Sequence, residues 1–212
     1  MSGSITLENR FGVNKMELIS LKYAIFVIVL LVLYYCFPKK YRWYVLLAGS
    51  MAYYVIICKW YVLFIIFTIC TTYGSTIWID KLLKKQNAIV KSHKEDWDRQ
   101  TRKDYKEKGR KKRVAVMLFA LLCNFGILAF LKYIPDAGEL GLLLPLGISF
   151  YTFQSMGYVM DVYREIVEPE KNFLKVALFV SFFPQIIQGP IAIYDKLAGQ
   201  LYEGHSLRLE NL

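Results

Sequence analysis

Polar side chains lie within a long apolar stretch of the sequence, at spacings that place them on one side of a helix. Residues 140–160 contain no Asp, Glu, Lys or Arg, yet they carry several hydroxyl and amide groups. Ser149, Thr152 and Ser155 are three residues apart, so they can share one helix face. Polar groups at membrane depth face the interior of a bundle or a water-filled cavity. These groups therefore either hydrogen-bond between helices or line a passage. The candidate lining residues are Ser149, Thr152, Gln154, Ser155, Tyr158 and Asp161.

A second stretch has a backbone that cannot continue as a regular helix. Residues 184–190 contain two prolines and a glycine, and proline removes a backbone hydrogen-bond donor. In hydrocarbon, broken backbone is tolerated only where protein or water satisfies the freed groups, and glutamine amides can do this. The stretch therefore predicts a kinked or re-entrant helix that forms one wall of a site. Its candidate residues are Pro184, Gln185, Gln188, Gly189 and Pro190.

The elements that must hold these residues are outlined by the distribution of charge. Six stretches of the 212-residue chain lack charged residues and are 15 to 21 residues long: 23–37, 43–58, 60–79, 114–131, 140–160 and 176–194. A helix needs about 20 apolar residues to cross a ~30 Å hydrocarbon core. The sequence therefore predicts an all-α polytopic membrane bundle of five to six spanning or re-entrant helices. A disordered chain, a disulfide-stabilised scaffold and a cytosolic enzyme fit poorly. The four cysteines lack the spacing of a metal or redox motif, and no metal site is predicted.

The net charge of +10 is concentrated in one loop. Residues 81–113 contain 14 Lys and Arg against 5 Asp and Glu, which accounts for +9 of it. Basic residues accumulate on the cytoplasmic side of membrane proteins, so the loop predicts orientation rather than a nucleic-acid partner. With this loop inside, the N-terminus lies outside a multi-pass protein of the plasma membrane. Apolar residues recur in the loop on one helix face, which predicts a cytoplasmic interfacial helix, with a solvated extension of the third span as the alternative. These residues are Leu82, Leu83, Ile89, Val90 and Trp97.

The predicted organisation has five parts. In order, they are an external lead-in (1–17), spans one to three (18–79), the basic cytoplasmic loop with its interfacial helix (80–113), spans four and five with the kinked segment (114–194), and a polar tail (195–212). Asp161 and Arg164 are three residues apart near the end of span five, so we expect them to form an interfacial ion pair, with contact to an acyl donor as the alternative.

Three blocks of the sequence stand out: residues 144–154 (LPLGISFYTFQ), 157–164 (GYVMDVYR) and 182–191 (FFPQIIQGPI). They resemble the membrane-bound O-acyltransferases, in the branch that includes alginate O-acetylation proteins and the D-alanyl transfer protein of teichoic acids. Residues 124–126, an Asn-Phe-Gly sequence, resemble the preceding helix of that branch. The resemblance extends from about residue 18 to residue 193.

The resemblance implies a membrane enzyme with a central funnel. Such an enzyme moves an acyl group, expected to be acetyl, from a cytoplasmic donor to a hydroxyl of an extracytoplasmic polysaccharide. The donor would be acyl-CoA or an acyl carrier, and no bound cofactor is expected. The implied partners are membrane lipids, a glycan acceptor, and an acyl-carrier or extracytoplasmic transferase protein, with no nucleic acid.

The base that such chemistry requires is not found in this sequence. A hydroxyl nucleophile needs a base, and the family uses a histidine in a Trp-His context on a later helix. The chain has two histidines, His93 in the basic loop and His205 near the end, and neither has those surroundings. No catalytic residue is therefore assigned. We expect the chain to be the N-terminal part of such an enzyme, inactive alone, whether as a truncated form, an incomplete gene product or one piece of a split protein.

Two other classes of function are compatible with the pattern. Broken helices and polar spans also line the pores of small channels and transporters, although no internal repeat is visible here. A non-catalytic assembly subunit that recruits partners through the basic loop is the third possibility.

Overall fold

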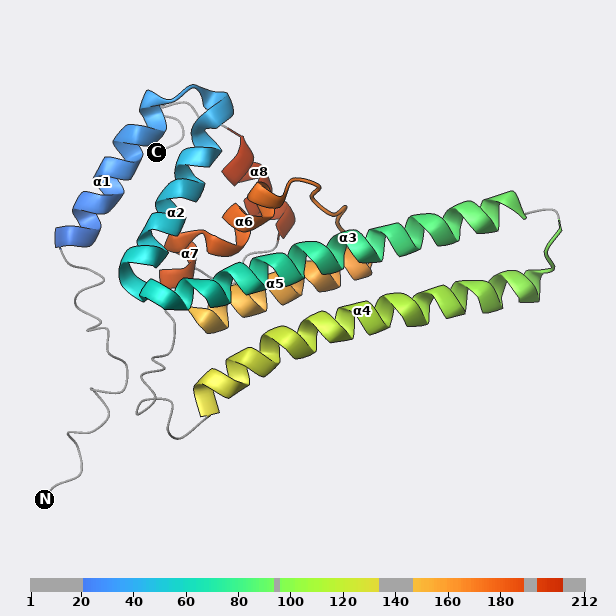
Figure 1. Ribbon diagram of the computed structural model, residues 1–212. Helices are drawn as coiled ribbons and strands as arrows, with labels where there is room; N and C mark the ends of the chain where they lie inside the picture. The colour runs from blue at the N-terminus through green and yellow to red at the C-terminus, as the bar shows by residue number, and fades with distance from the viewer. Residues whose placement is uncertain (1–20, 94–95, 134–146, 189–193, 204–212) are drawn as a thin grey trace, which may run out of the picture.

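The computed structural model describes residues 21–93, 96–133, 147–188 and 194–203, and within these ranges the secondary structure is entirely helical (Figure 1). The elements are α1 (Leu21–Cys36), η2 (Lys39–Tyr41), α2 (Arg42–Cys58), η3 (Lys59–Tyr61), α3 (Val62–Ser92), α4 (Arg99–Tyr133), α5 (Ile148–Tyr163), α6 (Phe173–Ser181), α7 (Phe183–Gln188) and α8 (Tyr194–Tyr202). The prediction of an all-α fold is confirmed for this part of the chain. The predicted lead-in, residues 1–17, lies outside it.

The fold is organised around α3, the helix that contacts α4, α5 and α6. Figure 1 shows α3 and α4 as a long antiparallel pair, with α5 alongside them. Ile65 and Ile69 of α3 join Val159 of α5 and Phe179 of α6 in one buried apolar cluster. Close packing of these side chains holds α5 and α6 against the long pair, since van der Waals contact drives the association of helices in a membrane.

Two helices, α3 and α4, are long and apolar enough to cross a membrane, as judged by length and composition. Helices α1, α2 and α5 have 16, 17 and 16 residues. At 1.5 Å per residue each covers about 24–26 Å, less than a ~30 Å hydrocarbon core. Figure 1 also shows α1 and α2 running across the direction of α3 rather than alongside it. The prediction of five to six spanning or re-entrant helices therefore stays a proposal.

The basic segment 80–113 does not form a separate helix, so the prediction of an interfacial helix is wrong. Helix α3 continues without a break to Ser92, and α4 begins at Arg99, well before the uncharged run 114–131. The basic residues thus belong to the outer halves of two paired helices, and the alternative of an extended third span is the correct one. The five apolar residues of the segment are half-buried. Trp97 stacks on His93, with the ring centroids 4.8 Å apart.

The helical conformation is interrupted at Phe182, between α6 and α7. Phe182 has an extended backbone, with φ −60° and ψ 100°, and Pro184 follows it in the short α7. The prediction that this stretch interrupts a regular helix is confirmed. The predicted polar tail, by contrast, begins with helix α8, in which Tyr194, Ala198 and Leu201 are buried. These residues are spaced i, i+4 and i+7, so they form one apolar helix face. The sequence analysis missed this face because charged residues lie between them.

One buried hydrogen bond joins the two long helices in their apolar halves. The Asn124 side chain on α4 donates through Nδ2 to Thr71 Oγ1 on α3 at 2.9 Å, and to the carbonyl of Ala120 at 2.8 Å. Asn124 is 2% exposed, so its amide has no access to water on this face. Interhelical bonds of this kind fix the register of membrane helices.

We expect Thr71→Val and Asn124→Leu to be coupled in their effects on stability. Each substitution removes one partner of the same hydrogen bond. The double variant should therefore lose less stability than the sum of the losses in the two single variants. The expected coupling is about 0.6–1.7 kcal/mol. Thermal unfolding of the four proteins in detergent measures it, with exposed Thr101→Val as the control. Strictly additive losses would contradict the assignment.

Candidate functional site

Helix α5 carries most of the candidate residues, and a glycine sets where it begins. Gly147 has φ 70°, a left-handed conformation that favours glycine, and its carbonyl accepts a hydrogen bond from the N–H of Tyr151. The helix then runs from Ile148 to Tyr163 between α3, α4 and α6.

The structure brings four of the predicted α5 residues together on a buried face. Thr152, Gln154, Ser155 and Tyr158 are each 2% exposed or less. Ser149 and Asp161, near the two ends of the helix, are half-buried. The shared face that the spacing predicted is therefore present, and it packs against protein.

Several hydroxyls near this face lack a hydrogen-bond partner among the described residues. They are Tyr151 Oη and Ser155 Oγ on α5, and Ser181 Oγ at the end of α6. Buried polar groups are normally paired, and an unpaired one costs about 1–3 kcal/mol. The sequence pointed to Ser155 but missed Tyr151 and Ser181, because both lie in runs dominated by aromatic and apolar residues.

Gln154 links α5 to α6. Its Nε2 donates to the carbonyl of Phe179 at 2.9 Å, in the last turn of α6. A carbonyl in that turn has no partner within its own helix, because the helix stops at Ser181. Gln154 thus satisfies the backbone that the break at Phe182 leaves open, which is the interhelical hydrogen bonding that the sequence left as one of two possibilities for this face.

The kinked segment packs inside the protein at its described residues. Phe183 is 2% exposed and lies against Tyr53 and Phe26, with ring centroids 5.2 Å and 5.4 Å away. Gln185 is 8% exposed and Pro184 is half-buried. Of the other candidates, Gln188 ends the backbone of α7, while Gly189 and Pro190 lie outside the described residues.

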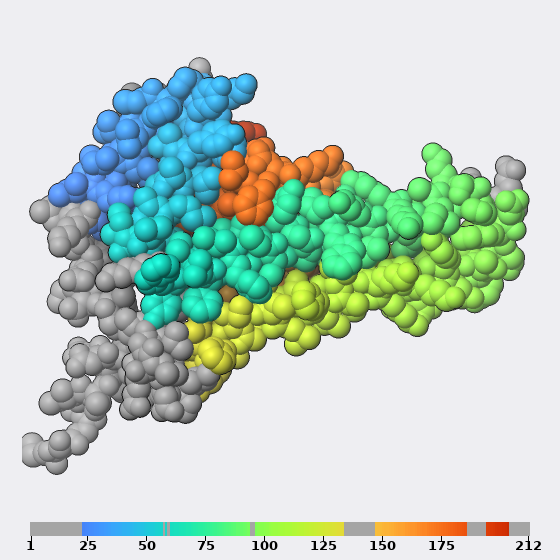
Figure 2. Space-filling view, viewed as in Figure 1, coloured from blue at the N-terminus to red at the C-terminus, as the bar shows by residue number. Residues whose placement is uncertain are grey.

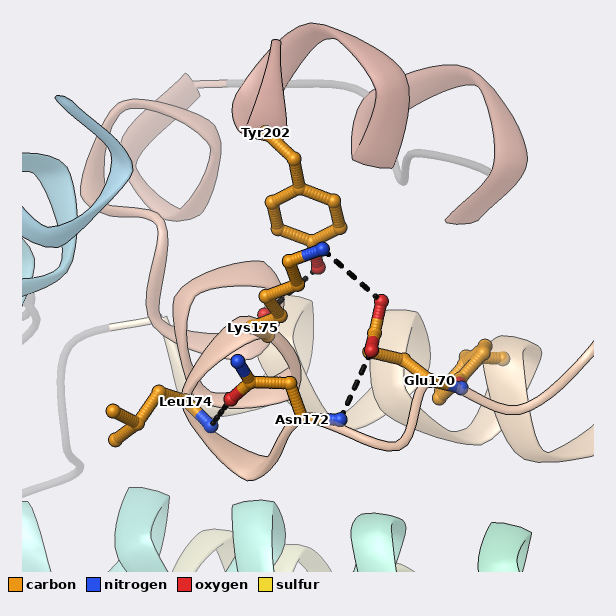
Figure 3. Close-up of polar contacts among 6 residues, drawn as sticks. Glu170, Asn172, Leu174, Lys175 and Tyr202 are labelled. Carbon is orange, nitrogen blue, oxygen red and sulfur yellow. Dashed lines mark hydrogen bonds and ion pairs between the residues drawn. The ribbon is translucent and has the colours of Figure 1, made fainter. Parts of the chain in front are cut away.

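A polar network surrounds the start of α6 (Figure 3). The Asn172 side chain caps the helix by accepting from the Leu174 N–H at 3.0 Å, while its own N–H donates to Glu170 Oε1 at 2.9 Å. Glu170 Oε2 faces Lys175 Nζ at 3.7 Å. The sequence could have revealed the cap, since Asn precedes an apolar helix, but not the partners that the fold supplies.

This network ties α8 and α5 to the start of α6. Tyr202 of α8 donates its hydroxyl to the carbonyl of Lys175 at 2.8 Å, beneath the Lys175 ammonium (Figure 3). Burial raises the pKa of Tyr202, so its phenol stays protonated and able to donate at neutral pH. Tyr158 of α5 accepts from the Glu170 N–H at 2.8 Å and stacks on Tyr194 at 4.1 Å. The candidate Tyr158 is therefore engaged in holding the loop before α6.

The expected ion pair between Asp161 and Arg164 is absent from the described part of the chain, so this prediction is wrong. Helix α5 ends between them, and Arg164 begins a turn in which Glu165 has φ 63°. The turn directs Glu165 to α4 instead, where its Oε1 accepts from Arg113 Nη1 at 2.7 Å. Arg113 is 52 positions away, which is why no local spacing indicated the pair.

The structure places His93 at the exposed C-cap of α3, where its ring stacks on Trp97. His205 lies outside the described residues. Within the described ranges, no group of three His, Cys, Asp or Glu side chains lies close enough to hold a metal ion.

Three relatives have names that describe acyl transfer. The chain is 30% identical over 190 residues to a protein named probable alginate O-acetylase AlgI of Azotobacter vinelandii, covering 86% of this chain and 35% of the relative. It is 32% identical over 120 residues to the peptidoglycan O-acetyltransferase of Helicobacter pylori, covering 40% of this chain and 23% of that protein. It is 33% identical over 89 residues to the teichoic acid D-alanyltransferase of Lacticaseibacillus rhamnosus, covering 42% of this chain and 22% of that protein.

The chain is therefore similar to part of several proteins that are named for O-acetyl or D-alanyl transfer. The relatives fall in the branch that the three sequence blocks resemble, so that resemblance is confirmed. The chain spans about a third of the length of the first relative and less than a quarter of the other two. No family model and no solved structure matches the chain.

Two of the family-like blocks meet in the fold. The first block supplies the N-terminal part of α5, and the third supplies the break and α7. Gln154, the last residue of the first block, bonds to the turn of α6 that immediately precedes the third. In this chain, the two blocks therefore form one packed unit.

We expect Gln154→Leu to lower the stability of the chain by about 1–3 kcal/mol, because the Phe179 carbonyl would stay buried without a donor. The melting temperature in detergent, followed by circular dichroism, measures the loss. Gln100→Leu, which removes an exposed amide, is the matched control and should change stability by less than about 0.5 kcal/mol. Equal melting temperatures for both variants would contradict the role of Gln154.

Proposed function

We propose that the chain is the N-terminal helical scaffold of a membrane O-acyltransferase that acts on an extracytoplasmic polysaccharide. The proposal is supported by homology, at 30% identity over 86% of the chain, to a relative named as an alginate O-acetylase. The other two relatives are named for transfer to peptidoglycan and for transfer of D-alanine to teichoic acid. All three names describe acyl transfer to a cell-surface polymer, with acetyl as the group in two of them.

The proposed reaction is attack of an acceptor hydroxyl on the carbonyl of an acyl thioester. The hydroxyl loses its proton to a base, the new ester bond forms, and the thiol of the donor leaves with a proton. Acyl-CoA and an acyl carrier protein are both donors of this class. The base is expected to be a histidine supplied by later helices, because His93 sits on the exposed surface at the end of α3.

The polar face of α5 and the kinked segment form the proposed passage for substrate. Its support is the set of buried hydroxyls without partners, Tyr151, Ser155 and Ser181, since a bound acyl or hydroxyl group would supply the missing hydrogen bonds. The proposed lining residues are Ser149, Thr152, Gln154, Ser155, Tyr158 and Asp161 on α5, with Pro184, Gln185, Gln188, Gly189 and Pro190 in and beyond α7.

We propose a multi-pass arrangement of five to six spanning or re-entrant helices in the plasma membrane, with the N-terminus outside. The outer halves of α3 and α4 would lie in the cytoplasm, as their excess of Lys and Arg favours. Helices α1, α2 and α5 would cross or enter the bilayer with protein partners around them. A carrier protein would meet the enzyme at its cytoplasmic end, and an extracytoplasmic transferase would meet it at the opposite end.

We expect the 212-residue chain to lack O-acetyltransferase activity when expressed alone, and to gain it with the remaining part of the Azotobacter vinelandii relative. The measurement is ester-linked acetate on alginate from cells that express each part alone or both together. In the combined system, Ser155→Val should lower acetylation at least about tenfold, because an apolar group fills the polar face.

Ser92→Val, at the exposed end of α3, serves as the matched control and should acetylate at the wild-type level. Acetylation by the 212-residue chain alone would refute the view that later helices supply the base. Equal activity of the two serine variants would refute the proposed passage.

A further inference from the structure

The outer halves of α3 and α4 form an open surface pocket that the proposed acyl transfer does not use. Figure 2 shows this paired part of the chain as an arm that extends beyond the other helices. The pocket has a volume of about 570 Å³. It is lined by Leu83, Gln86 and Asn87 of α3, by Lys103, Lys106, Glu107, Arg110 and Arg113 of α4, and by Glu165 after α5.

The pocket is rich in positive charge from one face of α4. Its four cations, Lys103, Lys106, Arg110 and Arg113, are spaced i, i+3, i+7 and i+10, so they project from the same side of the helix. Arg113 pairs with Glu165.

The other acidic wall residue, Glu107, pairs instead with Lys111 at 3.2 Å. Among the described residues, Lys103, Lys106 and Arg110 therefore have no acidic partner. Unpaired cations that face a common space are the usual recognition elements for an anion.

Two buried polar atoms at the pocket lack partners in the described part of the chain. Arg113 is 7% exposed, and its Nε is a buried donor without an acceptor. Gln86 is 5% exposed, and its Oε1 is a buried acceptor without a donor. A Cβ at Gly109 would clash with the Gln86 amide, so the glycine lets the two helices approach closely there. If these side chains turn slightly toward the pocket, a ligand that carries both an anionic oxygen and a hydroxyl would satisfy both atoms.

The position of the pocket along the helices indicates where such a ligand would lie. Arg113 immediately precedes the uncharged run 114–131 of α4, and Leu83 follows shortly after the uncharged run 60–79 of α3. Both runs lie in the two helices that are long and apolar enough to cross a membrane. The pocket thus sits where the apolar halves end, at the depth of phospholipid headgroups.

We propose that this pocket binds a phosphate ester, and that its source is the headgroup of an anionic phospholipid. Arg113 and the three unpaired cations hold the phosphate oxygens, and a headgroup hydroxyl donates to Gln86 Oε1. The site anchors the base of the arm to the membrane surface. The inference does not depend on acyltransferase activity, so it is tested without that activity.

The test uses the full chain in nonionic detergent and short-chain dihexanoyl phosphatidylglycerol as the probe, with binding followed by isothermal titration calorimetry. Lys106→Gln/Arg110→Gln should weaken binding about tenfold or more, because two charge-assisted contacts are lost. The matched control is Lys108→Gln/Lys112→Gln, which removes the same charge from exposed positions on the opposite face of α4. It should change the affinity less than about twofold. Gln86→Leu, which keeps the charge, should also weaken phosphatidylglycerol binding.

Glycerol 3-phosphate and dihexanoyl phosphatidylcholine distinguish the sources of the phosphate. Binding of phosphatidylglycerol that glycerol 3-phosphate does not displace supports the lipid headgroup. Displacement at similar concentrations supports phosphate recognition with a soluble ester as the ligand. Three results would overturn the proposal. The first is equal weakening of phosphatidylglycerol binding by both double variants, and the second is binding of phosphatidylcholine as strong as that of phosphatidylglycerol. The third is a Lys106→Gln/Arg110→Gln variant that alters only the binding of an acidic carrier protein. Circular dichroism of each variant verifies that its helices are intact.

Discussion

Polar groups that are buried among apolar helices must find their partners inside the protein, and this requirement organises the described part of the chain. Asn124 meets it between the two long helices by bonding to Thr71. Gln154 meets it at the end of α6 by bonding to the Phe179 carbonyl. Helix breaks are stable here because a side chain from a neighbouring helix supplies what the broken backbone loses.

The same requirement makes the exceptions informative. The hydroxyls of Tyr151, Ser155 and Ser181, which have no partner among the described residues, lie on α5 and α6 in or next to the blocks that resemble the acyltransferases. The unpartnered atoms of Gln86 and Arg113 lie at the base of the charged arm. Ser50 on α2 and Thr72 on α3 are further buried hydroxyls without a partner among the described residues. The first set supports the proposed passage for a hydroxyl or acyl group, and the second set supports the proposed phosphate site.

The long pair of helices connects these two places. Helix α3 packs against α5 and α6 in its apolar half and against the cationic face of α4 in its outer half. The ion pair between Arg113 and Glu165 links the arm to the turn that follows α5. In an acyltransferase of this branch, contact of the arm with the membrane surface would therefore help to hold the candidate passage in place.

The sequence alone determined the class of the fold, the interruption of a helix next to Pro184 and the resemblance to the acyltransferases. These features depend on composition, periodicity and local backbone chemistry, which neighbouring residues carry. Only the tertiary structure decided that residues 80–113 extend two helices, that residues after 194 form a packed helix, and that Arg113 pairs with Glu165 rather than Asp161 with Arg164. Those outcomes depend on which surfaces cover one another across 50 or more positions. An apolar stripe indicates that something must cover it, but the covering element, lipid or helix, is decided by packing.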